Sequence, residues 1–353
     1  EIARKYEDRF HHDLANLNII AAQKYPRASE SIELMHEMIS ELIQKGSAYI
    51  GEDKCVYFDA QSFAGYGQIS GNRLDALKPG HRYEYVEDGA KKFHADWALW
   101  KAAGNRKEMI WDSPWGPGFP GWHIECTAMS TKYLGKQFDI HGGGMDLKFP
   151  HHEDEIAQSC ASHGCNPANY WMHANMLTLN GKQMAKSTGN NILPMEIITG
   201  ENTILSKAFS PSVTRFFMLQ AHYRSNLDFT NDAILAAEKG YFRLMEAIDG
   251  LKDINASATS TLSISNWEAA CYEAMNDDFN SPILIAQLFE GVRFINLLKD
   301  NKETLTQSDL QLFSSLMKGF VFDVLGLENE KAVGNNNEKL EGVVNMLIDM
   351  RNH

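Results

Sequence analysis

Three residues near the middle of the chain have the chemical character of zinc ligands. Cys126 offers a thiolate, His151 an imidazole and Glu155 a carboxylate. His151 and Glu155 are four residues apart and follow Pro150, a residue favoured at the first position of a helix, so both side chains would lie on one helix face. Three protein ligands of this kind are typical of a zinc site that keeps one position open for a substrate atom. We therefore predict a metal site formed by Cys126, His151 and Glu155.

Each of these residues also has an ordinary structural interpretation. A lone Cys is usually a small buried apolar residue, and a His–Glu pair at helical spacing is often a solvated surface pair. The glycine run 142–144 favours the metal interpretation, because glycines let the backbone approach a ligand closely. Cys160 and Cys165 flank His163, but their spacing matches no common zinc motif.

A second stretch, residues 180–190, suits a polyphosphate. It contains two lysines, Lys182 and Lys186, together with two small hydroxyl residues and two glycines. Lysines supply mobile positive charge, and loop amides and hydroxyls donate hydrogen bonds to phosphate oxygens. The stretch is not a Walker loop, which needs the pattern Gly-x4-Gly-Lys-Ser/Thr before a helix. Surface loops often share this composition, so both interpretations stay open at this point.

These groups must be positioned by regular elements. Apolar periodicity and turn residues predict helices over 1–22, 30–45 and 151–163, a hairpin over 49–58, and strands over 138–140 and 176–179. Residues 60–121 are rich in Gly, Pro and Trp, which predicts an irregular insertion with short strands and a loop at 111–118. The alternation of helix and strand from 122 to 180 predicts an α/β core.

The remainder is expected to be helical. After Pro211 the pattern predicts helices throughout, and residues 229–353 are expected to form a helical bundle. The Ser/Thr-rich segment 256–265 is predicted to be a loop, and the Asn-rich segment 334–337 a flexible linker. The predicted fold class is thus α/β plus all-α.

Bulk properties limit the function classes. With 353 residues the chain can form two or three domains. A formal net charge of −13 argues against nucleic-acid binding through overall charge, although a local basic patch stays possible. Five cysteines are a sparse, odd set, which favours reduced thiols in the cytoplasm. We expect no membrane span and no signal peptide, and the missing initiator Met indicates a piece of a longer protein.

The segment from Gly121 to Glu155 contains the runs Trp-His-Ile-Glu-Cys and Pro-His-His-Glu-Asp-Glu. It resembles the metal-site region of the cysteinyl-tRNA synthetases, a class I aminoacyl-tRNA synthetase family. Lys182 to Ser187 resembles the Lys-Met-Ser-Lys-Ser loop of that class. The resemblance spans essentially the whole chain. It implies a zinc ion held by two Cys, one His and one Glu, of which Cys126, His151 and Glu155 match three.

The resemblance also implies what lies outside the sequence. The family's remaining Cys ligand and its His-Ile-Gly-His signature, which acts on ATP, belong to a half that would precede residue 1, and no such tetrapeptide occurs here. We therefore expect a fragment: 1–120 as connective insertion and flanking helices, 121–228 as the second half of a Rossmann-type catalytic core, and 229–353 as a truncated tRNA-binding helical domain. Such a fragment would be inactive in isolation.

The implied activity is ATP-dependent activation of L-cysteine to cysteinyl adenylate, with magnesium, and transfer of the cysteinyl group to tRNA(Cys). Lys186 matches the second Lys of the class loop and would stabilise the pyrophosphate leaving group. The loop departs from the pattern at Gln183 and Ala185, where a Lys and a Ser are usual, and Lys182 could replace the lost charge. The predicted phosphate-binding residues are Lys182, Gln183, Met184, Ala185, Lys186 and Ser187.

Cysteine must be separated from serine, which differs only by oxygen for sulfur. An apolar pocket discriminates such small changes by only about 1–3 kcal/mol, whereas zinc binds a soft thiolate far better than a hydroxyl. We interpret the metal as a specificity device. Trp122 is expected to form a wall of the pocket, and His141 and Asp146 to face the substrate, with Asp146 pairing the ammonium group. The alternatives are a core Trp, a strand-end cap and a turn residue.

The sequence also indicates roles for residues beside the predicted ligands and suggests three alternative functions. His152 is expected to be only a neighbour of the ligand, and His123 and Glu125 to be structural. One rival function is a cysteine–amino sugar ligase of the same superfamily, and another is a non-catalytic fragment that binds zinc and tRNA. An esterase is suggested by His141-Gly-Gly-Gly, but it would need a Gly-x-Ser-x-Gly motif that the chain lacks.

Overall fold

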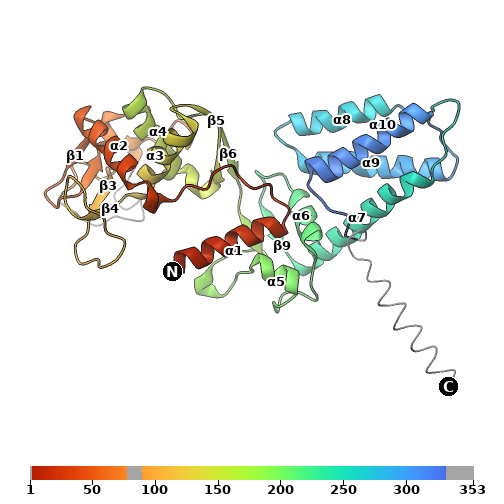
Figure 1. Cartoon of the computed structure of the whole chain (residues 1–353), viewed down its shortest axis with the longest axis horizontal. Coiled ribbons are helices and arrows are strands. Elements are labelled where there is room, and N and C mark those ends of the chain that lie inside the picture. The colour runs from red at the N-terminus through yellow and green to blue at the C-terminus, as the bar shows by residue number, and fades with distance from the viewer. Residues whose placement is uncertain (1, 78–89, 331–353) are drawn as a thin grey trace, which may run out of the picture. The chain divides into compact units, whose positions relative to one another are not determined.

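The computed structural model describes residues 2–77 and 90–330 (Figure 1). The chain divides into two compact units. One is Ala22–Asn175, and the other comprises the described parts of Glu1–Ala21 and Met176–His353. Each unit is considered by itself. Their limits do not coincide with the predicted domain boundaries at 120 and 228, so that domain assignment stays a prediction, and the predicted linker 334–337 lies outside the described residues.

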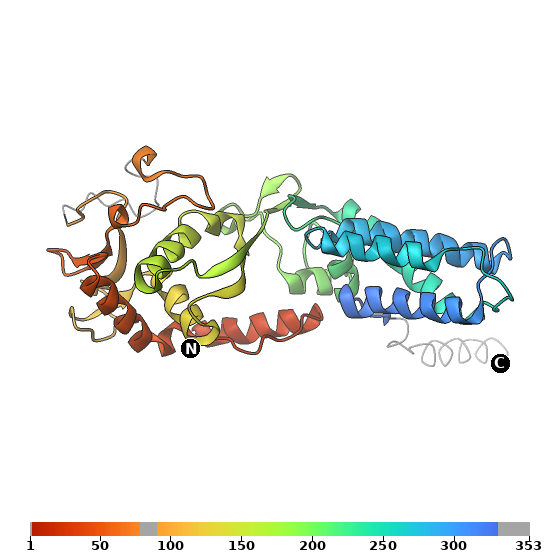
Figure 2. The same cartoon turned by 90° about the horizontal axis from the view of Figure 1, so that it is seen from above.

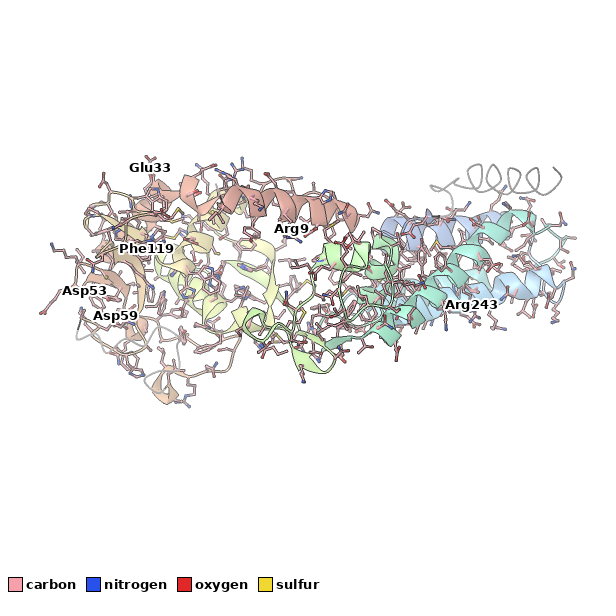
Figure 3. The ribbon with its side chains drawn as sticks, turned by 90° about the horizontal axis from the view of Figure 1, so that it is seen from below. Arg9, Glu33, Asp53, Asp59, Phe119 and Arg243 are labelled. Atoms are coloured by element: carbon pink, nitrogen blue, oxygen red, sulfur yellow. The ribbon has the colours of Figure 1, made fainter. Side chains whose placement is uncertain are left out.

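The unit 22–175 begins with helix α2 (Ile32–Gln44), which ends before Gly46, a residue with φ of +76°. The predicted helix and hairpin are confirmed. The antiparallel sheet has the order β1-β2-β3-β4, formed by β1 (Ala48–Ile50), β2 (Val56–Phe58), β3 (Trp97–Ala102) and β4 (Gly118–Pro120). Figure 3 labels Asp53 and Asp59, which precede and follow β2 in the sequence, and Phe119, which belongs to β4.

Tryptophans of the irregular segment contribute large aromatic side chains to the core of this part. Trp97 stacks on Phe58 with ring centroids 4.4 Å apart, and Trp100 lies 6.1 Å from Trp115. The predicted loop 111–118 is confirmed, and it is closed by paired backbone hydrogen bonds between Trp111 and Gly118. These large side chains, together with α2, form a rigid base for the elements that follow.

Those elements form an α/β layer. Helix α3 (Trp122–Leu134) precedes β5 (Phe138–Gly144), the 3-10 helix η4 (Met145–Lys148), α4 (His151–His163) and β6 (Ala168–Ala174). Strands β5 and β6 are parallel, and they lie side by side with α3 and α4 in Figures 1 and 2. The predicted strand 138–140 is too short, because the glycines continue the pairing with β6 to residue 144. Strand β6 itself was not predicted.

The other unit contains α1 (Ile2–Asn16), so the predicted N-terminal helix exists but ends at residue 16 and not at 22. Its small sheet has the order β8-β7-β9. The elements of this region are β7 (Leu177–Leu179), β8 (Lys182–Gln183), the 3-10 helix η5 (Lys186–Thr188), α5 (Pro194–Thr199), α6 (Pro211–Leu219) and β9 (Leu227–Phe229). The expectation of uninterrupted helix after Pro211 is wrong at β9, which pairs in parallel with β7.

The predicted bundle is formed by α7 (Asn231–Asp249), α8 (Ile264–Asn276), α9 (Ser281–Lys299) and α10 (Gln307–Lys318), followed by a π-helical turn (Gly319–Val324). Figure 2 shows these helices running alongside each other, and Arg243, labelled in Figure 3, lies over the ring of Phe289 on α9. By length and composition alone α9 could span a membrane, contrary to the expectation that no run was long enough. Its apolar residues Leu284, Leu288 and Ile295 are buried in the bundle core.

Candidate functional site

The structure brings the three predicted zinc ligands together. Cys126 lies on α3, and His151 and Glu155 lie one turn apart on α4. The donor atoms of all three lie within 4.8 Å of one another. His151 Nε2 is 2.8 Å from Glu155 Oε1, and both side chains are buried. Sequence positions 25 residues or more apart therefore meet at one point between two packed helices.

Local sequence explains why the helices begin where they do. Pro150 occupies the N-cap of α4, so His151 is its first residue and projects from the helix start. Gly121 occupies the N-cap of α3, where a Cβ would collide with the carbonyl oxygen of Ala98 in β3. Only glycine permits this approach of α3 to the sheet. The packing of α3 on β3 fixes the position of Cys126.

The donor set fits a metal cation. Glu155 is only 1% exposed, and among the described residues its Oε1 accepts no hydrogen bond of good geometry, although His151 Nε2 lies 2.8 Å away. In the described part of the chain its ion pairs are with histidines, His151 and His141, and with no Lys or Arg. Burying a carboxylate is costly unless it is paired or coordinates a metal. Sulfur, nitrogen and oxygen donors together are the set that zinc accepts.

The electrostatics point the same way. Burial raises the pKa of Cys126 to about 12, and the nearby carboxylates of Glu155 and Glu125 add to this shift. A cation beside the sulfur would reverse that effect and hold the thiolate. Burial lowers the pKa of His141, and it lowers the pKa of His152 to about 3 with help from neighbouring histidines. Both imidazoles are therefore neutral at pH 7 and can offer a lone pair.

A second donor group shares Glu155. The ligand atoms of His141, His152 and Glu155 also lie within 4.8 Å of one another. His152 Nδ1 lies 2.8 Å from His173 Nε2 on β6, and His141 stacks on Trp171 with ring centroids 4.6 Å apart. His152, expected to be only a neighbour of the ligand, is thus part of a second possible coordination group.

Sequence reasoning missed His173 and Trp171 because it did not predict β6. The signal was present in the spacing of these residues, which are two positions apart. In a strand such residues share a face. Had β6 been recognised as the parallel partner of β5, both side chains would have been placed beside the glycine run.

The predicted amino-acid-binding residues have different environments. Trp122 is 58% exposed, which contradicts the core interpretation, and its ring centroid lies 4.3 Å from that of His151. His141 belongs to the second donor group. Asp146 is exposed in η4 and belongs to neither donor group. The roles of these three residues in binding cysteine stay predictions.

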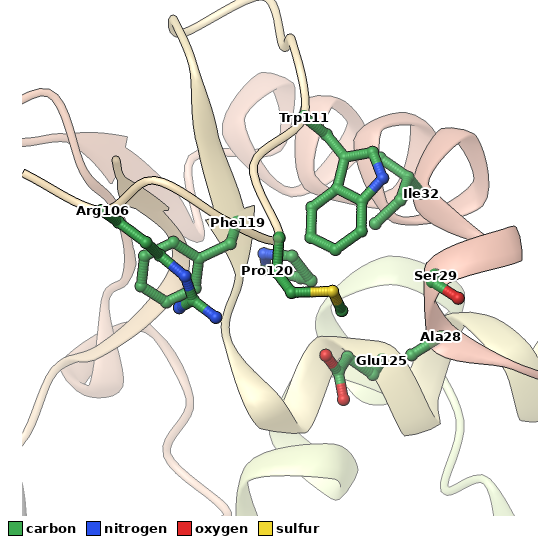
Figure 4. A pocket seen from close by; sticks show the side chains of 9 residues that line it. Ala28, Ser29, Ile32, Arg106, Trp111, Phe119, Pro120 and Glu125 are labelled. Carbon is green, nitrogen blue, oxygen red and sulfur yellow. The ribbon is translucent and has the colours of Figure 1, made fainter. Parts of the chain in front are cut away.

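The residues expected to be structural also separate into two cases. Glu125 lines a pocket of about 100 Å³ with Ile32, Trp111 and Phe119, and Figure 4 shows Arg106 over the Phe119 ring, 4.1 Å from its centre. None of the predicted zinc ligands lines this pocket. His123, in contrast, contacts a predicted ligand, because its Nδ1 lies 2.8 Å from His151 Nδ1.

The predicted phosphate loop belongs to the other unit, where it forms a hairpin between β7 and β8. Asn180 and Gly181 have φ of +52° and +73°, the left-handed pair typical of a two-residue hairpin turn. Asn190 Nδ2 donates to the carbonyl of Gln183 at 3.0 Å and thereby closes the loop. The side chains of Lys182, Gln183 and Ser187 are exposed, and those of Met184 and Ala185 are partly buried.

Comparisons with known proteins agree on the fold. Residues 1–239 match the family model described as the tRNA synthetases class I (C) catalytic domain, and residues 270–329 match the DALR domain. A methionyl-tRNA synthetase from Mycobacterium tuberculosis, in complex with methionyl-adenylate, has a TM-score of 0.57 at 13% identity, covering 92% of this chain and 76% of that one. A putative arginyl-tRNA synthetase from Campylobacter jejuni has a TM-score of 0.55 at 13% identity, with 90% and 66% covered. The predicted fold class is confirmed.

Relatives with higher identity specify the family. A protein from Bacteroides fragilis named cysteine–tRNA ligase is 46% identical over 99% of this chain, and the match covers 72% of that protein. The same name belongs to a protein from Porphyromonas gingivalis that is 44% identical over 94% of this chain and 68% of its own length. The predicted resemblance is confirmed by these matches, and the chain belongs to the cysteine–tRNA ligase family of class I aminoacyl-tRNA synthetases.

Proposed function

We propose that the protein works as a cysteine–tRNA ligase, which uses ATP to activate L-cysteine as cysteinyl adenylate and transfers the cysteinyl group to tRNA(Cys). The identity of 46% to a named cysteine–tRNA ligase supports this activity over the amino sugar ligase. The observation that supports it at atomic level is the convergence of the donor atoms of Cys126, His151 and Glu155 within 4.8 Å.

Within this function Cys126, His151 and Glu155 hold a zinc ion. Bound zinc supplies a soft coordination position that accepts a thiolate and discriminates against a hydroxyl. The chain's own residues shape the space around that position. Trp122, whose ring lies beside His151, forms an outer wall. His141, neutral and held flat against Trp171, faces the substrate side chain, and the Asp146 carboxylate pairs with the substrate ammonium group.

The phosphate loop serves the other end of the reaction. The substrate carboxylate attacks the α-phosphate of ATP, and no covalent enzyme intermediate is required, so catalysis consists of positioning and charge stabilisation. Lys186 stabilises the charge that develops on the leaving pyrophosphate, with magnesium accompanying ATP. Lys182, directly after the hairpin turn, supplies the positive charge that Gln183 lacks. The five cysteines are free thiols, which supports a cytoplasmic location.

The test compares Cys126→Ser with the matched control Cys165→Ser, both made in the complete gene product that carries this chain. Cys165 is a partly buried free thiol whose Sγ contacts a backbone carbonyl and belongs to neither donor group. We expect Cys126→Ser to lose zinc and its preference for cysteine over serine in ATP–pyrophosphate exchange, while Cys165→Ser keeps both. An unchanged preference in Cys126→Ser would contradict the proposed role of the metal.

A further inference from the structure

Two histidine rings from different helices face each other at the edge of the proposed metal site. His123 of α3 and His151 of α4 have their Nδ1 atoms 2.8 Å apart. The other nitrogen of His151, Nε2, lies 2.8 Å from Glu155 Oε1. Both nitrogens of His151 are therefore engaged, one by the donor group and one by His123.

The proton positions follow from this geometry. Of two ring nitrogens 2.8 Å apart, one must carry the hydrogen that lies between them. A nitrogen that binds a metal must offer a lone pair, so His151 Nε2 must be unprotonated and its proton must be on Nδ1. His151 then donates to His123 Nδ1, and the proton of His123 must be on Nε2.

Asp154 favours this arrangement. His123 Nε2 lies 3.3 Å from Asp154 Oδ2, and the Asp154 side chain is fully buried. If His123 carried its proton on Nδ1 instead, its Nε2 lone pair would face the carboxylate, and His151 would be protonated on Nε2, which cannot then bind a metal. Without a metal, Glu155 Oε1 faces His151 Nε2 and favours a proton on that nitrogen. Once Nε2 binds the metal, the Asp154 carboxylate favours the His123 tautomer that accepts the His151 Nδ1 proton, and so supports the metal-binding tautomer of His151.

Asp154 is itself held from the irregular segment that follows β2. Tyr66 donates its hydroxyl hydrogen to Asp154 Oδ1 at 2.7 Å. The adjacent residue, Glu153, is fully buried and accepts backbone hydrogen bonds from Gly67, Ile69 and Ser70 at 2.6–3.0 Å. The neighbouring carboxylates of Glu153 and Asp154 on α4 therefore hold residues 66–70 in place. The resulting series of contacts runs from Tyr66 to Asp154, then to His123 and finally to His151.

We propose that His123, oriented by Asp154 and Tyr66, is a positioning residue that holds His151 in the Nδ1-protonated tautomer and directs its Nε2 lone pair toward the metal. This inference rests on the proposed zinc site. Outer partners of metal-bound histidines contribute about 10- to 100-fold in metal affinity. In this chain the outer partner is the imidazole of His123, so the proton of His123 must also be held on its Nε2, the nitrogen that faces Asp154.

The primary experiment measures the zinc affinity of the full-length protein, as in the test of Cys126→Ser, by competition with a chromogenic chelator. His123→Leu removes the acceptor, and we expect zinc to bind 10- to 100-fold more weakly. His123→Asn retains an acceptor oxygen close to the position of Nδ1, and we expect affinity within about threefold of wild type. The matched control is His163→Leu, on the last turn of α4 and outside both donor groups, which should leave affinity unchanged.

Two milder variants keep the test valid if His123→Leu fails to fold. Asp154→Asn retains the size of the side chain but can present an amide hydrogen to His123, which favours the reverse tautomer. Tyr66→Phe removes only the hydroxyl. We expect weaker zinc binding in both, with the larger loss in Asp154→Asn. The ¹⁵N signals of His151 in zinc-loaded wild type should show a protonated Nδ1 and an unprotonated Nε2, and Asp154→Asn at the same zinc concentration should show less of this tautomer.

The outcomes separate this inference from the zinc site on which it rests. If Cys126→Ser abolishes zinc binding while His123→Leu and Asp154→Asn bind as tightly as wild type, the positioning role is wrong and the metal site stands. If His123→Asn is as weak as His123→Leu, ring packing rather than the acceptor is responsible, and the inference also fails. If wild type binds no zinc, or Cys126→Ser binds it normally, both proposals fall.

Discussion

Two adjacent glycines of β5 should differ strongly in their response to substitution by alanine. A Cβ at Gly143 would lie 2.8 Å from His152 Cε1 and 3.0 Å from both His152 Nε2 and Leu147 Cδ1. At Gly142 the nearest atom would be the carbonyl oxygen of Met172, at an ordinary 3.8 Å. Neither glycine has a positive φ. Gly142→Ala is therefore a matched control for Gly143→Ala in the same strand.

The magnitude follows from the overlap. Carbon atoms in good contact are about 3.5–4.0 Å apart, so the new methyl group is at least roughly 0.7 Å too close to His152. His152 is 1% exposed and cannot swing into solvent. Overpacking of this kind costs about 1–3 kcal/mol, and loss of the contact between His152 and His173 adds about 1 kcal/mol. We expect Gly143→Ala to lose about 2–4 kcal/mol and Gly142→Ala to change by less than about 1 kcal/mol in either direction.

Urea unfolding followed by tryptophan fluorescence measures this difference. Six of the seven tryptophans lie in the unit 22–175, so the signal reports mainly on that unit. With a slope near 2 kcal/mol per molar urea, the midpoint of Gly143→Ala should fall by about 1–2 M. Equal midpoints for the two variants, or a Gly143→Ala midpoint at the wild-type value, would refute the close packing of His152 against β5.

Three further predictions concern other parts of the chain. Burial raises the pKa of Cys271 to about 12, so the thiol ionises near pH 9 in the unfolded protein but stays protonated in the folded one. The free energy of unfolding should therefore fall as the pH rises above about 9, by at most about 1.4 kcal/mol per pH unit. In denaturant titrations between pH 9 and 10, the free energy of unfolding of Cys271→Ala should depend less steeply on pH. Arg215 donates hydrogen bonds to the carbonyl oxygens of Leu325 at 2.6 Å and Leu17 at 2.8 Å. In urea unfolding, Arg215→Ala should therefore lose about 2–3 kcal/mol of stability, and Arg215→Lys should lose less. An Arg215→Ala variant as stable as wild type would contradict this role. Asn190→Ala removes the hydrogen bonds to the carbonyl oxygens of Gln183 and Lys182, which are worth about 1.4 kcal/mol. This variant should therefore raise the KM for ATP about tenfold and leave zinc affinity unchanged. A change confined to zinc affinity would show that the hairpin has another role.

The parts of the site that could be predicted from the sequence depend on local spacing. His151 and Glu155 share a helix face because four residues make about one turn, and Asn180-Gly181 favours a hairpin turn through its own backbone preferences. The predicted helix over 30–45 follows from apolar periodicity in the same way. Each of these inferences uses information contained within a dozen residues.

The parts that could not be predicted depend on partners distant in the sequence. The glycines 142–144 are weak strand formers, and they remain extended because β6, about thirty residues later, pairs with them. Strand β9 has three residues and no period of its own, and it exists through its pairing with β7. The contact between His123 and His151 requires two helices to pack at one distance and angle, which no residue pattern along either helix specifies.

Strand β9 connects the predicted phosphate hairpin to the helical bundle. Phe229 is the last residue of β9 and accepts a hydrogen bond from the backbone of Asn180, in the hairpin turn, while the next residue, Thr230, is the N-cap of α7. Asp228, also in β9, accepts from the backbone of Gly181 at 2.7 Å. The hairpin turn and the start of α7 are therefore joined through the last two residues of β9 and the N-cap residue that follows them. A substitution that disrupts β9 is therefore expected to disturb both the hairpin turn and the first turn of the helical bundle.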